Sequence, residues 1–395
     1  MANKAAIARA YLAARWARKP RRAAPCGPVC DERAMAAEFE KFNVLGVGLD
    51  EARRLARVEM ETGKNPHPGY SFGLSTGTMG EPGVFLTNEA ERDRWLGTIL
   101  GRYLKLGQLA SLHAALLLKH NNRLYAGSSR VHYFDISEPA NHWAPRLCDL
   151  APNVLIGPPS VLLAVAESSA FLKRPFQPHT VIAGAEPLFP QDRERLRRAY
   201  HSAPRTIYQA KEGFLAAGCR EGALHWNEDL MQVEWMYFRG RPERAVPVIT
   251  DFTRESQRFE RYRIDDVVLC EESGRCACGS QFARVTAVEG RLHDVILLPG
   301  ARGGYDPLFP LEVNRVLQAA GEYTLVQHDG YHFTLAMAKT PPPEVLAELA
   351  ERLRQPSRLE LVPLRPDAPG RKRRRVQRLF DPGNEIILET MLEPL

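Results

Sequence analysis

From about residue 150 onward, short apolar runs alternate with longer amphipathic stretches, and this alternation limits the folds open to the chain. Residues 153–156 have the pattern of a buried strand, and the prolines at 158–159 suit the start of a helix. Residues 180–183 and 205–208 repeat the strand pattern, with a charged helical stretch at 191–200 between them. Strands that alternate with helices are typical of a parallel sheet, so this region is predicted to be α/β.

Strand and helix signals also occur on both sides of this region. Residues 71–74 and 84–87 have strand patterns around a Gly-rich turn, and Asn88 with Glu91 predicts a capped helix that runs to Leu100. Near the C-terminus, strand patterns surround Asp329-Gly330, which predicts a hairpin. The predicted C-terminal elements are strands at 323–327 and 332–336 and helices at 311–320 and 343–354. At 395 residues, the chain is predicted to form a large α/β domain, residues 1–289, and a small α+β domain, residues 290–395.

Composition limits the class of protein. Apolar residues make up 44% of the chain and charged residues 25%, and no apolar run approaches the roughly 18 residues that span a bilayer. A protein with no membrane contact is therefore expected. Seven cysteines without a signal peptide favour a reducing compartment, so a cytoplasmic location is expected.

The net charge of +6 is concentrated in basic clusters at residues 14–22 and 371–378. Nucleic acid is one partner that such clusters could bind, but no aromatic-interleaved recognition motif accompanies them. Solvated helix faces and a polyanionic small-molecule substrate are the favoured interpretation, with no nucleic-acid partner. Residues 1–22 are predicted to form an ordinary leading helix, and an organelle transit peptide is the alternative.

Residues 73–82, with the sequence GLSTGTMGEP, form the strongest local signal for chemistry. Glycines let backbone amides converge on phosphate oxygens, and hydroxyl side chains add further donors. The segment is neither a Walker loop nor a dinucleotide fingerprint, because it lacks Gly-Lys-Ser/Thr and Gly-x-Gly-x-x-Gly. A flexible turn is the alternative interpretation. The predicted phosphate-binding residues are Ser75, Thr76, Gly77, Thr78 and Gly80.

Four later segments, read in order with this one, resemble motifs of the adenylate-forming superfamily. They are Gly-Ala-Glu-Pro-Leu at 184–188, Tyr-Gln-Ala-Lys-Glu-Gly at 208–213, Arg-Tyr-Arg-Ile-Asp-Asp at 261–266 and Gly-Arg-Leu-His-Asp at 290–294. The chain is most similar to the compact phenylacetate–CoA ligase-like branch, close to its group of probable adenylate-forming enzymes. The resemblance implies a large N-terminal adenylation domain followed by a small mobile C-terminal domain.

The resemblance also implies an activity. The enzyme would use ATP to convert a carboxylic acid, aromatic or otherwise small, into an acyl-AMP. It would then form a thioester with coenzyme A or with a carrier-protein phosphopantetheine thiol. A catalytically decayed nucleotide-binding homologue, or a ligase with an amine acceptor, is the alternative. An acyl carrier protein as partner and a homodimer as oligomeric state both stay open.

Individual roles follow from the same resemblance. Glu212 would hold Mg²⁺ on the phosphates, and Asp266 would bind the ribose hydroxyls unless it only pairs with a loop arginine. Lys211 stands where the motif usually carries Thr, which places a cation beside the phosphates. Lys372 is the best candidate for the C-terminal catalytic lysine, although it can also be read as part of a solvated basic tail. The remaining nucleotide-binding candidates are Ala185, Glu186, Pro187, Tyr208, Gln209 and Arg291.

Four residues suggest a metal site separate from the nucleotide. Cys219 and His225 lie about fifty residues before Cys276 and Cys278, and thiolates with imidazole are the ligands that structural zinc prefers. The same positions resemble Cys, His and Cys-x-Cys-Gly in the phenylacetate–CoA ligase-like branch. A structural zinc ion is expected, and ordinary core cysteines are the alternative.

Overall fold

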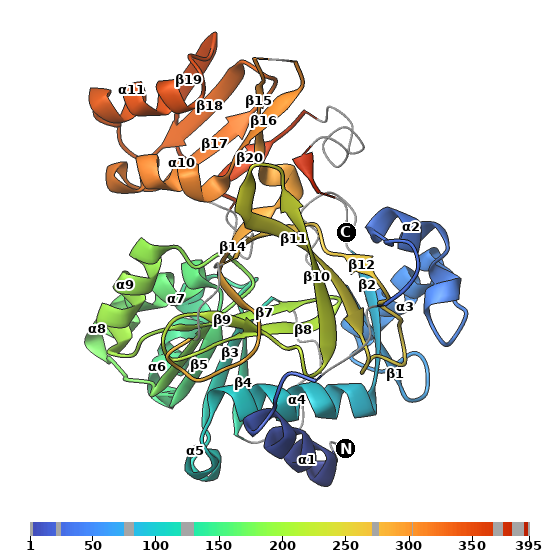
Figure 1. Ribbon diagram of the computed structural model, residues 1–395. Coiled ribbons are helices and arrows are strands. Elements are labelled where there is room, and N and C mark those ends of the chain that lie inside the picture. The colour runs from blue at the N-terminus through green and yellow to red at the C-terminus, as the bar shows by residue number, and fades with distance from the viewer. Residues whose placement is uncertain are drawn as a thin grey trace. The chain divides into compact units, whose positions relative to one another are not determined.

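The computed structural model describes residues 3–20, 25–74, 83–119, 130–270, 276–301, 303–365, 374–380 and 391–393 (Figure 1). The chain divides into two compact units. Unit 1 comprises residues 1–233, 248–264 and 273–286, and unit 2 comprises residues 234–247, 265–272 and 287–395. The predicted boundary between functional domains at residue 290 stays a prediction.

Unit 1 holds the N-terminal helices and the parallel strands. Its helices are α1 (Lys4–Arg15), α2 (Glu32–Ala37), η1 (Phe39–Phe42), α3 (Leu49–Thr62), α4 (Glu89–Tyr103), α5 (Leu106–Ala110), α6 (Ala140–Leu150), α7 (Pro159–Ala166), α8 (Ser169–Lys173) and α9 (Pro190–Tyr200). Its strands are β1 (Tyr70–Leu74), β2 (Val84–Asn88), β3 (Ala114–Leu118), β4 (Val131–Asp135), β5 (Val154–Gly157), β6 (Thr180–Ala183), β7 (Arg205–Ala210), β8 (Gly213–Gly218), β9 (Leu224–Trp226) and β12 (Tyr262–Arg263).

The main sheet of unit 1 is parallel over the strand order β4-β3-β5-β6-β7. Val154 of β5, for example, is in register with Ala114 of β3 and Thr180 of β6. Beyond β7, the strands β8 and β9 continue the sheet in antiparallel pairs. The predicted α/β class is confirmed, and so are the predicted buried strands and the charged helix.

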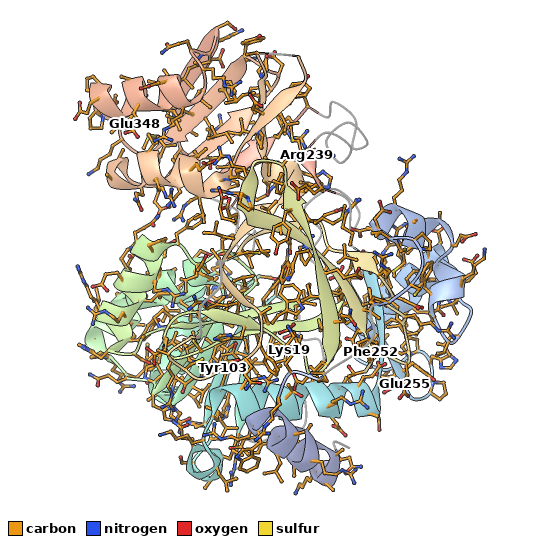
Figure 2. The ribbon with its side chains drawn as sticks, viewed as in Figure 1. Lys19, Tyr103, Arg239, Phe252, Glu255 and Glu348 are labelled. Carbon is orange, nitrogen blue, oxygen red and sulfur yellow. The ribbon has the colours of Figure 1, made fainter. Side chains whose placement is uncertain are left out.

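Helices cover both faces of this sheet (Figure 1). Leu155 packs against the side that α6–α9 cover, whereas its neighbour Val154 packs against the side of α4. Successive strand residues point to opposite faces, so a strand buried on both faces must be apolar throughout. At the end of α4, the Tyr103 hydroxyl donates to the Thr206 carbonyl at 2.7 Å and accepts from the Gly218 amide at 3.2 Å (Figure 2).

Helix α1 packs closely on α4 because α4 carries two glycines at the contact. A β-carbon on Gly97 would lie 2.4 Å from the carbonyl oxygen of Ile7, and one on Gly101 would lie 2.6 Å from that of Tyr11. Both distances are shorter than van der Waals contact allows, so side chains there would push α1 away. The predicted leading helix is therefore present, although it ends at Arg15, before Pro20.

Residues 25–44, called here the N-terminal strap, run beside residues 256–263. Helix α2 and η1 lie within the strap. Backbone hydrogen bonds join the two segments at both ends, and residue 30 forms a parallel bridge with residue 262. The bonds are Cys30 N to Arg261 O (2.9 Å), Arg263 N to Cys30 O (2.7 Å), Arg258 N to Phe42 O (2.8 Å) and Val44 N to Ser256 O (3.1 Å).

Strands β10 (Met231–Phe238), β11 (Arg241–Asp251) and β14 (Arg284–Arg291) each begin in one unit and end in the other. The remaining elements of unit 2 are β13 (Asp266–Cys270), η3 (Leu292–Asp294), β15 (Ile296–Pro299), β16 (Tyr305–Leu308), α10 (Pro310–Leu317), η4 (Gln318–Ala320), β17 (Tyr323–Gln327), β18 (His332–Met337), α11 (Pro343–Arg352), β19 (Arg358–Pro363) and β20 (Val376–Arg378).

A four-stranded sheet in the order β19-β18-β17-β20 forms the core of unit 2 with α10 and α11. The predicted hairpin at Asp329-Gly330 is confirmed: β17 and β18 pair antiparallel, and the Asp329 carboxylate accepts from the amides of Tyr331 and His332. Among the described residues, no helix combines the length and the apolar composition that crossing a bilayer requires.

Candidate functional site

The hairpin β1–β2 holds the two ends of the Ser/Thr/Gly-rich segment together, because Leu74 pairs with Val84. Ser75, Thr76, Gly77, Thr78 and Gly80 lie outside the described residues. Gly83, which follows them, lies against the turn between β7 and β8. A β-carbon on Gly83 would be 3.0 Å from Lys211 Nζ and 3.1 Å from Glu32 Oε1. Gly83, the residue after the segment, therefore lies beside Lys211 of the predicted motif at 208–213.

Lys211 and Glu212 are the two turn residues between β7 and β8, because Ala210 and Gly213 pair across that turn. Tyr208 is buried in β7 and packs edge-on against Trp226, with ring centroids 5.7 Å apart. The register shifts between residues 208 and 209, so Gln209 follows a bulge. Sequence motifs placed at the carboxyl end of a parallel strand occupy the edge where ligands bind in open α/β sheets.

Two charged side chains meet at this turn. The Lys211 ammonium forms an ion pair with Glu32 of α2 and lies 3.9 Å from Glu212 Oε1. The side chain of Lys211 is 12% exposed and that of Glu212 is 5% exposed, whereas that of Glu32 is 53% exposed. A buried carboxylate has the oxygen donor that Mg²⁺ prefers, so the chemistry of Glu212 is compatible with the expected metal-ligand role, which stays a prediction.

Behind the turn lies a buried arginine that sequence reasoning missed. Arg254 donates to the carbonyl oxygens of Glu212 (3.1 Å) and Leu86 (2.6 Å), and its side chain is fully buried. Its ring neighbours are Trp95 and Phe259, at 5.1 and 5.0 Å from the guanidinium. Burial lowers the pKa of Arg254, although the carboxylates around it raise it. One side chain thus ties β2 to the β7–β8 turn.

Arg254 pairs with Glu91, the residue in the first turn of α4 that forms a capping box with Asn88. Glu91 Oε2 lies 3.8 Å from Arg254 Nε and accepts from the Asn88 amide, which completes the predicted capping box. Its other oxygen accepts from the amides of Glu255 (2.6 Å) and Ser256 (2.8 Å). A helix cap in the sequence is therefore also the centre of a buried polar network.

The second predicted segment follows β6. Gly184 is required by space, because a β-carbon there would lie 2.5 Å from the Ile207 side chain, and Ala185 has a φ of 66°. Both carboxylate oxygens of Glu186 accept from Ser160, at 2.9 Å from its hydroxyl and 3.1 Å from its amide. Glu186 thus fastens the start of α7, and Pro187 continues the turn towards α9. Their nucleotide-binding roles stay predictions.

In unit 2, Asp266 and Arg291 form an ion pair. Arg291 Nε lies 2.9 Å from Asp266 Oδ1, and Asp266 is buried. Asp266 thus pairs with the arginine of the predicted motif at 290–294. Lys372 lies outside the described residues, but Arg374 pairs with Asp294. Burial raises the pKa of Asp294, and Arg374 opposes this shift.

A further buried carboxylate of unit 2, Glu289, immediately precedes the predicted motif at 290–294. Glu289 Oε1 accepts from Arg244 Nε at 3.1 Å, and Oε2 has no hydrogen-bond partner among the described residues. Burial raises the pKa of Glu289 to about 7; Arg244 lowers it and Glu312 raises it.

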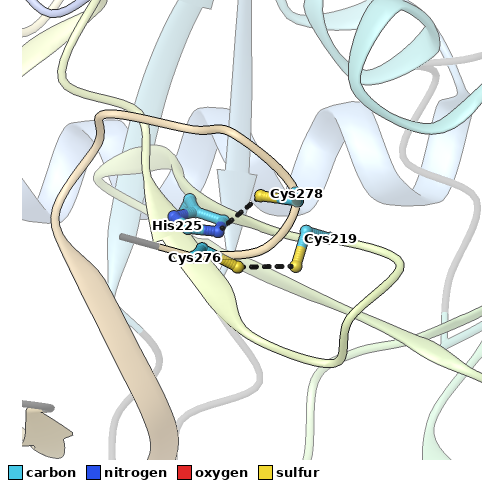
Figure 3. A group of neighbouring side chains, drawn as sticks. All are labelled: Cys219, His225, Cys276 and Cys278. Atoms are coloured by element: carbon cyan, nitrogen blue, oxygen red, sulfur yellow. Dashed lines mark hydrogen bonds between the residues drawn. The ribbon is translucent and has the colours of Figure 1, made fainter. Parts of the chain in front are cut away.

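Cys219, His225, Cys276 and Cys278 come together in unit 1 (Figure 3). Their ligand atoms all lie within 4.8 Å of one another. Cys219 begins the β8–β9 turn and His225 lies in β9, while the other two cysteines lie on the turn before β14. Cys219 Sγ is 3.8 Å from Cys276 Sγ, and Cys278 Sγ is 3.2 Å from His225 Nε2.

The distances between these ligand atoms suit a cation with tetrahedral coordination. With Zn–S bonds of about 2.3 Å, two thiolates of a tetrahedron lie about 3.8 Å apart. His225 Nδ1 donates to the Phe282 carbonyl at 3.3 Å, which leaves the Nε2 lone pair directed at the thiols. Partial burial, followed by the thiols of Cys276 and Cys219, raises the pKa of Cys278 to about 12, so a cation would have to displace its proton. The four residues fit zinc.

No family model and no curated protein matches the sequence, so the matches to known proteins are all to solved structures. A 2-hydroxyisobutyryl-CoA ligase in the postadenylation state matches with a TM-score of 0.59 at 16% identity, over 90% of this chain and 80% of that one. The amide bond synthetase McbA from Marinactinospora thermotolerans matches with a TM-score of 0.56 at 16% identity, over 78% of this chain and 68% of that one.

An anthranilate CoA ligase in complex with anthranoyl-AMP matches with a TM-score of 0.53 at 13% identity, over 76% of this chain and 65% of that one. These three proteins share one architecture. The chain has the fold of the adenylate-forming ligases. Its predicted fold class is therefore confirmed. In this fold, residues 184–188 follow β6, whereas residues 208–213 span the end of the neighbouring parallel strand β7 and the turn that leads into β8.

Proposed function

We propose that the protein is an ATP-dependent ligase that converts a small carboxylic acid into an acyl-AMP and passes the acyl group to a thiol. The observation that carries the proposal is the proximity of two regions with predicted motifs: Gly83, the residue after the predicted phosphate segment, lies against Lys211 of the motif at 208–213. The adenylate-forming fold supports the same conclusion. The thiol would belong to coenzyme A or to a carrier-protein phosphopantetheine.

Adenylation requires a carboxylate to attack the α-phosphate, so two anions must approach each other. The main task of the protein is then charge neutralisation and alignment. Lys211 contributes a cation at the end of the phosphate segment, and Glu212 would hold Mg²⁺ through a carboxylate oxygen. Bound there, Mg²⁺ would supply further neutralisation of the phosphates. Arg254 keeps the turn that carries both residues in place.

Asp266 would bind the ribose hydroxyls, with Arg291 as the partner that holds its carboxylate. Tyr208 would contribute its ring to the adenine site, together with the backbone at residues 184–187. Lys372 would reach the substrate carboxylate during adenylation. We also propose that Cys219, His225, Cys276 and Cys278 bind one zinc ion. The role of this ion would be structural, because four protein ligands leave no open position for substrate.

Exchange of labelled pyrophosphate into ATP tests the adenylation step directly. A panel of aromatic and short aliphatic acids should contain at least one that stimulates exchange above the acid-free rate. A product assay with that acid should then find a thioester when coenzyme A or phosphopantetheine is supplied. Failure of every acid to stimulate exchange, in protein that binds ATP, would favour a decayed nucleotide-binding homologue instead.

An amine acceptor is the second candidate, since an amide bond synthetase has the same fold. The same acid should then be offered with an amine in place of the thiol. Amide formed faster than thioester would replace the thiol in the proposal and leave the adenylation step unchanged.

A further inference from the structure

We infer that Lys211 binds the nucleotide phosphates. Without nucleotide, the Glu32 carboxylate pairs with the Lys211 ammonium, and the bound phosphates displace that carboxylate. The inference rests on the proposed function and adds to it an autoinhibitory contact. It concerns Glu32, which belongs to none of the motifs that predict the nucleotide site.

The two partners of the ion pair differ greatly in exposure. The Lys211 side chain is 12% exposed, whereas that of Glu32 is 53% exposed. The ammonium is therefore fixed within the turn, while the carboxylate can rotate into solvent at little cost. An ion pair with only a stabilising role would not require a carboxylate that moves so easily into solvent.

The position of the pair identifies what would replace Glu32. Glu32 Oε1 and Lys211 Nζ both face Gly83, the residue that follows the Ser/Thr/Gly-rich segment. A triphosphate bound at Lys211 would bring several negative charges to a site where Glu32 already supplies one. The phosphates and Glu32 would therefore compete for the same ammonium, and their mutual repulsion would favour release of Glu32.

The strap holds Glu32 at this position. Cys30 accepts from and donates to the backbone beside β12, and Asp31 Oδ2 lies 3.1 Å from Arg263 Nη2. Asp31 also caps α2, whose first residue is Glu32. The carboxylate is thus presented by an anchored segment, two residues after a strand-like pairing. Release of Glu32 needs only a rotamer change and leaves the strap in place.

Isothermal titration with ATP and Mg²⁺, and separately with adenosine, tests the inference. Glu32→Gln keeps the size of the side chain and removes its charge, so ATP should bind about two- to fivefold more tightly. Adenosine affinity should not change. Lys211→Gln should weaken ATP binding about tenfold, and the double variant should bind ATP no better than Lys211→Gln alone.

Glu38→Gln is the matched control, because Glu38 belongs to the same strap but pairs with Lys41. It should leave both affinities unchanged, and thermal unfolding should show that every variant is folded. ATP affinity that Glu32→Gln leaves unchanged or weakens would overturn the inference while the proposed function stands. Wild-type protein that binds no ATP at all would overturn both.

Discussion

Removal of the Arg254 guanidinium by Arg254→Met should destabilise unit 1 by about 3–5 kcal/mol, the usual cost of breaking one side of a buried ion pair. The side chain is fully buried, and its loss leaves the Glu91 carboxylate without its buried cation. The carbonyl oxygens of Glu212 and Leu86 would also lose a donor. Typical domains have 5–15 kcal/mol of stability, so the loss would be a large fraction of the total.

Urea unfolding followed by tryptophan fluorescence is a suitable assay, because Trp95 lies beside the guanidinium. Arg54→Met is the matched control: Arg54 also pairs with a glutamate, Glu51, but its side chain is 62% exposed, so the cost should stay below about 0.5 kcal/mol. Adding Glu91→Gln to Arg254→Met should cost less than the sum of the single changes, since the unpaired charge is removed. Equal stability losses in Arg254→Met and Arg54→Met would refute the reasoning.

Three further perturbations test other parts of the molecule. Glu212→Gln should slow pyrophosphate exchange about 100-fold with little loss of stability, because an amide is a poor Mg²⁺ ligand; unchanged exchange would exclude Glu212 as that ligand. Elemental analysis should find about one zinc per chain, and Cys276→Ser with Cys278→Ser should release it and lower the unfolding midpoint by about 5–10 °C; a wild type with no zinc and full stability would contradict the site. Burial raises the pKa of Glu289 to about 7 in the folded protein, whereas the unfolded chain has the ordinary value of 4.5. The folded protein therefore keeps a proton on Glu289 that the unfolded chain releases, so the stability should fall as the pH rises from 4.5 to about 7. Glu289→Gln should remove that component from unfolding measured at pH 5 and at pH 8, and an identical pH dependence in both proteins would show that Glu289 is not its source.

Local signals in the sequence predicted the parallel strands, the capping box at Asn88 and the hairpin at Asp329, because each depends on neighbouring residues. The types and spacing of Cys219, His225, Cys276 and Cys278, with their resemblance to positions in the phenylacetate–CoA ligase-like branch, also predicted the Cys and His cluster. The sequence could not predict contacts between residues that lie far apart in the chain, because such contacts leave no local sequence pattern. Arg254 is one example, since a buried arginine looks like a surface arginine in sequence. The Glu32–Lys211 pair is another, because 179 residues separate its members.

The hydrogen bonds between the strap and the residues around β12 also limit the order in which parts of the protein can fold during translation. Gly27 and Arg261, which hydrogen-bond in the folded chain, are 234 residues apart. At about 5–20 residues per second, the ribosome needs roughly ten to fifty seconds to make the chain between them. Throughout that time the strap lacks its partner segment at residues 256–263, and long-range closure of this kind is slow even in a complete chain. The parallel strands can form earlier, so the proposed nucleotide site would be completed among the last parts of unit 1.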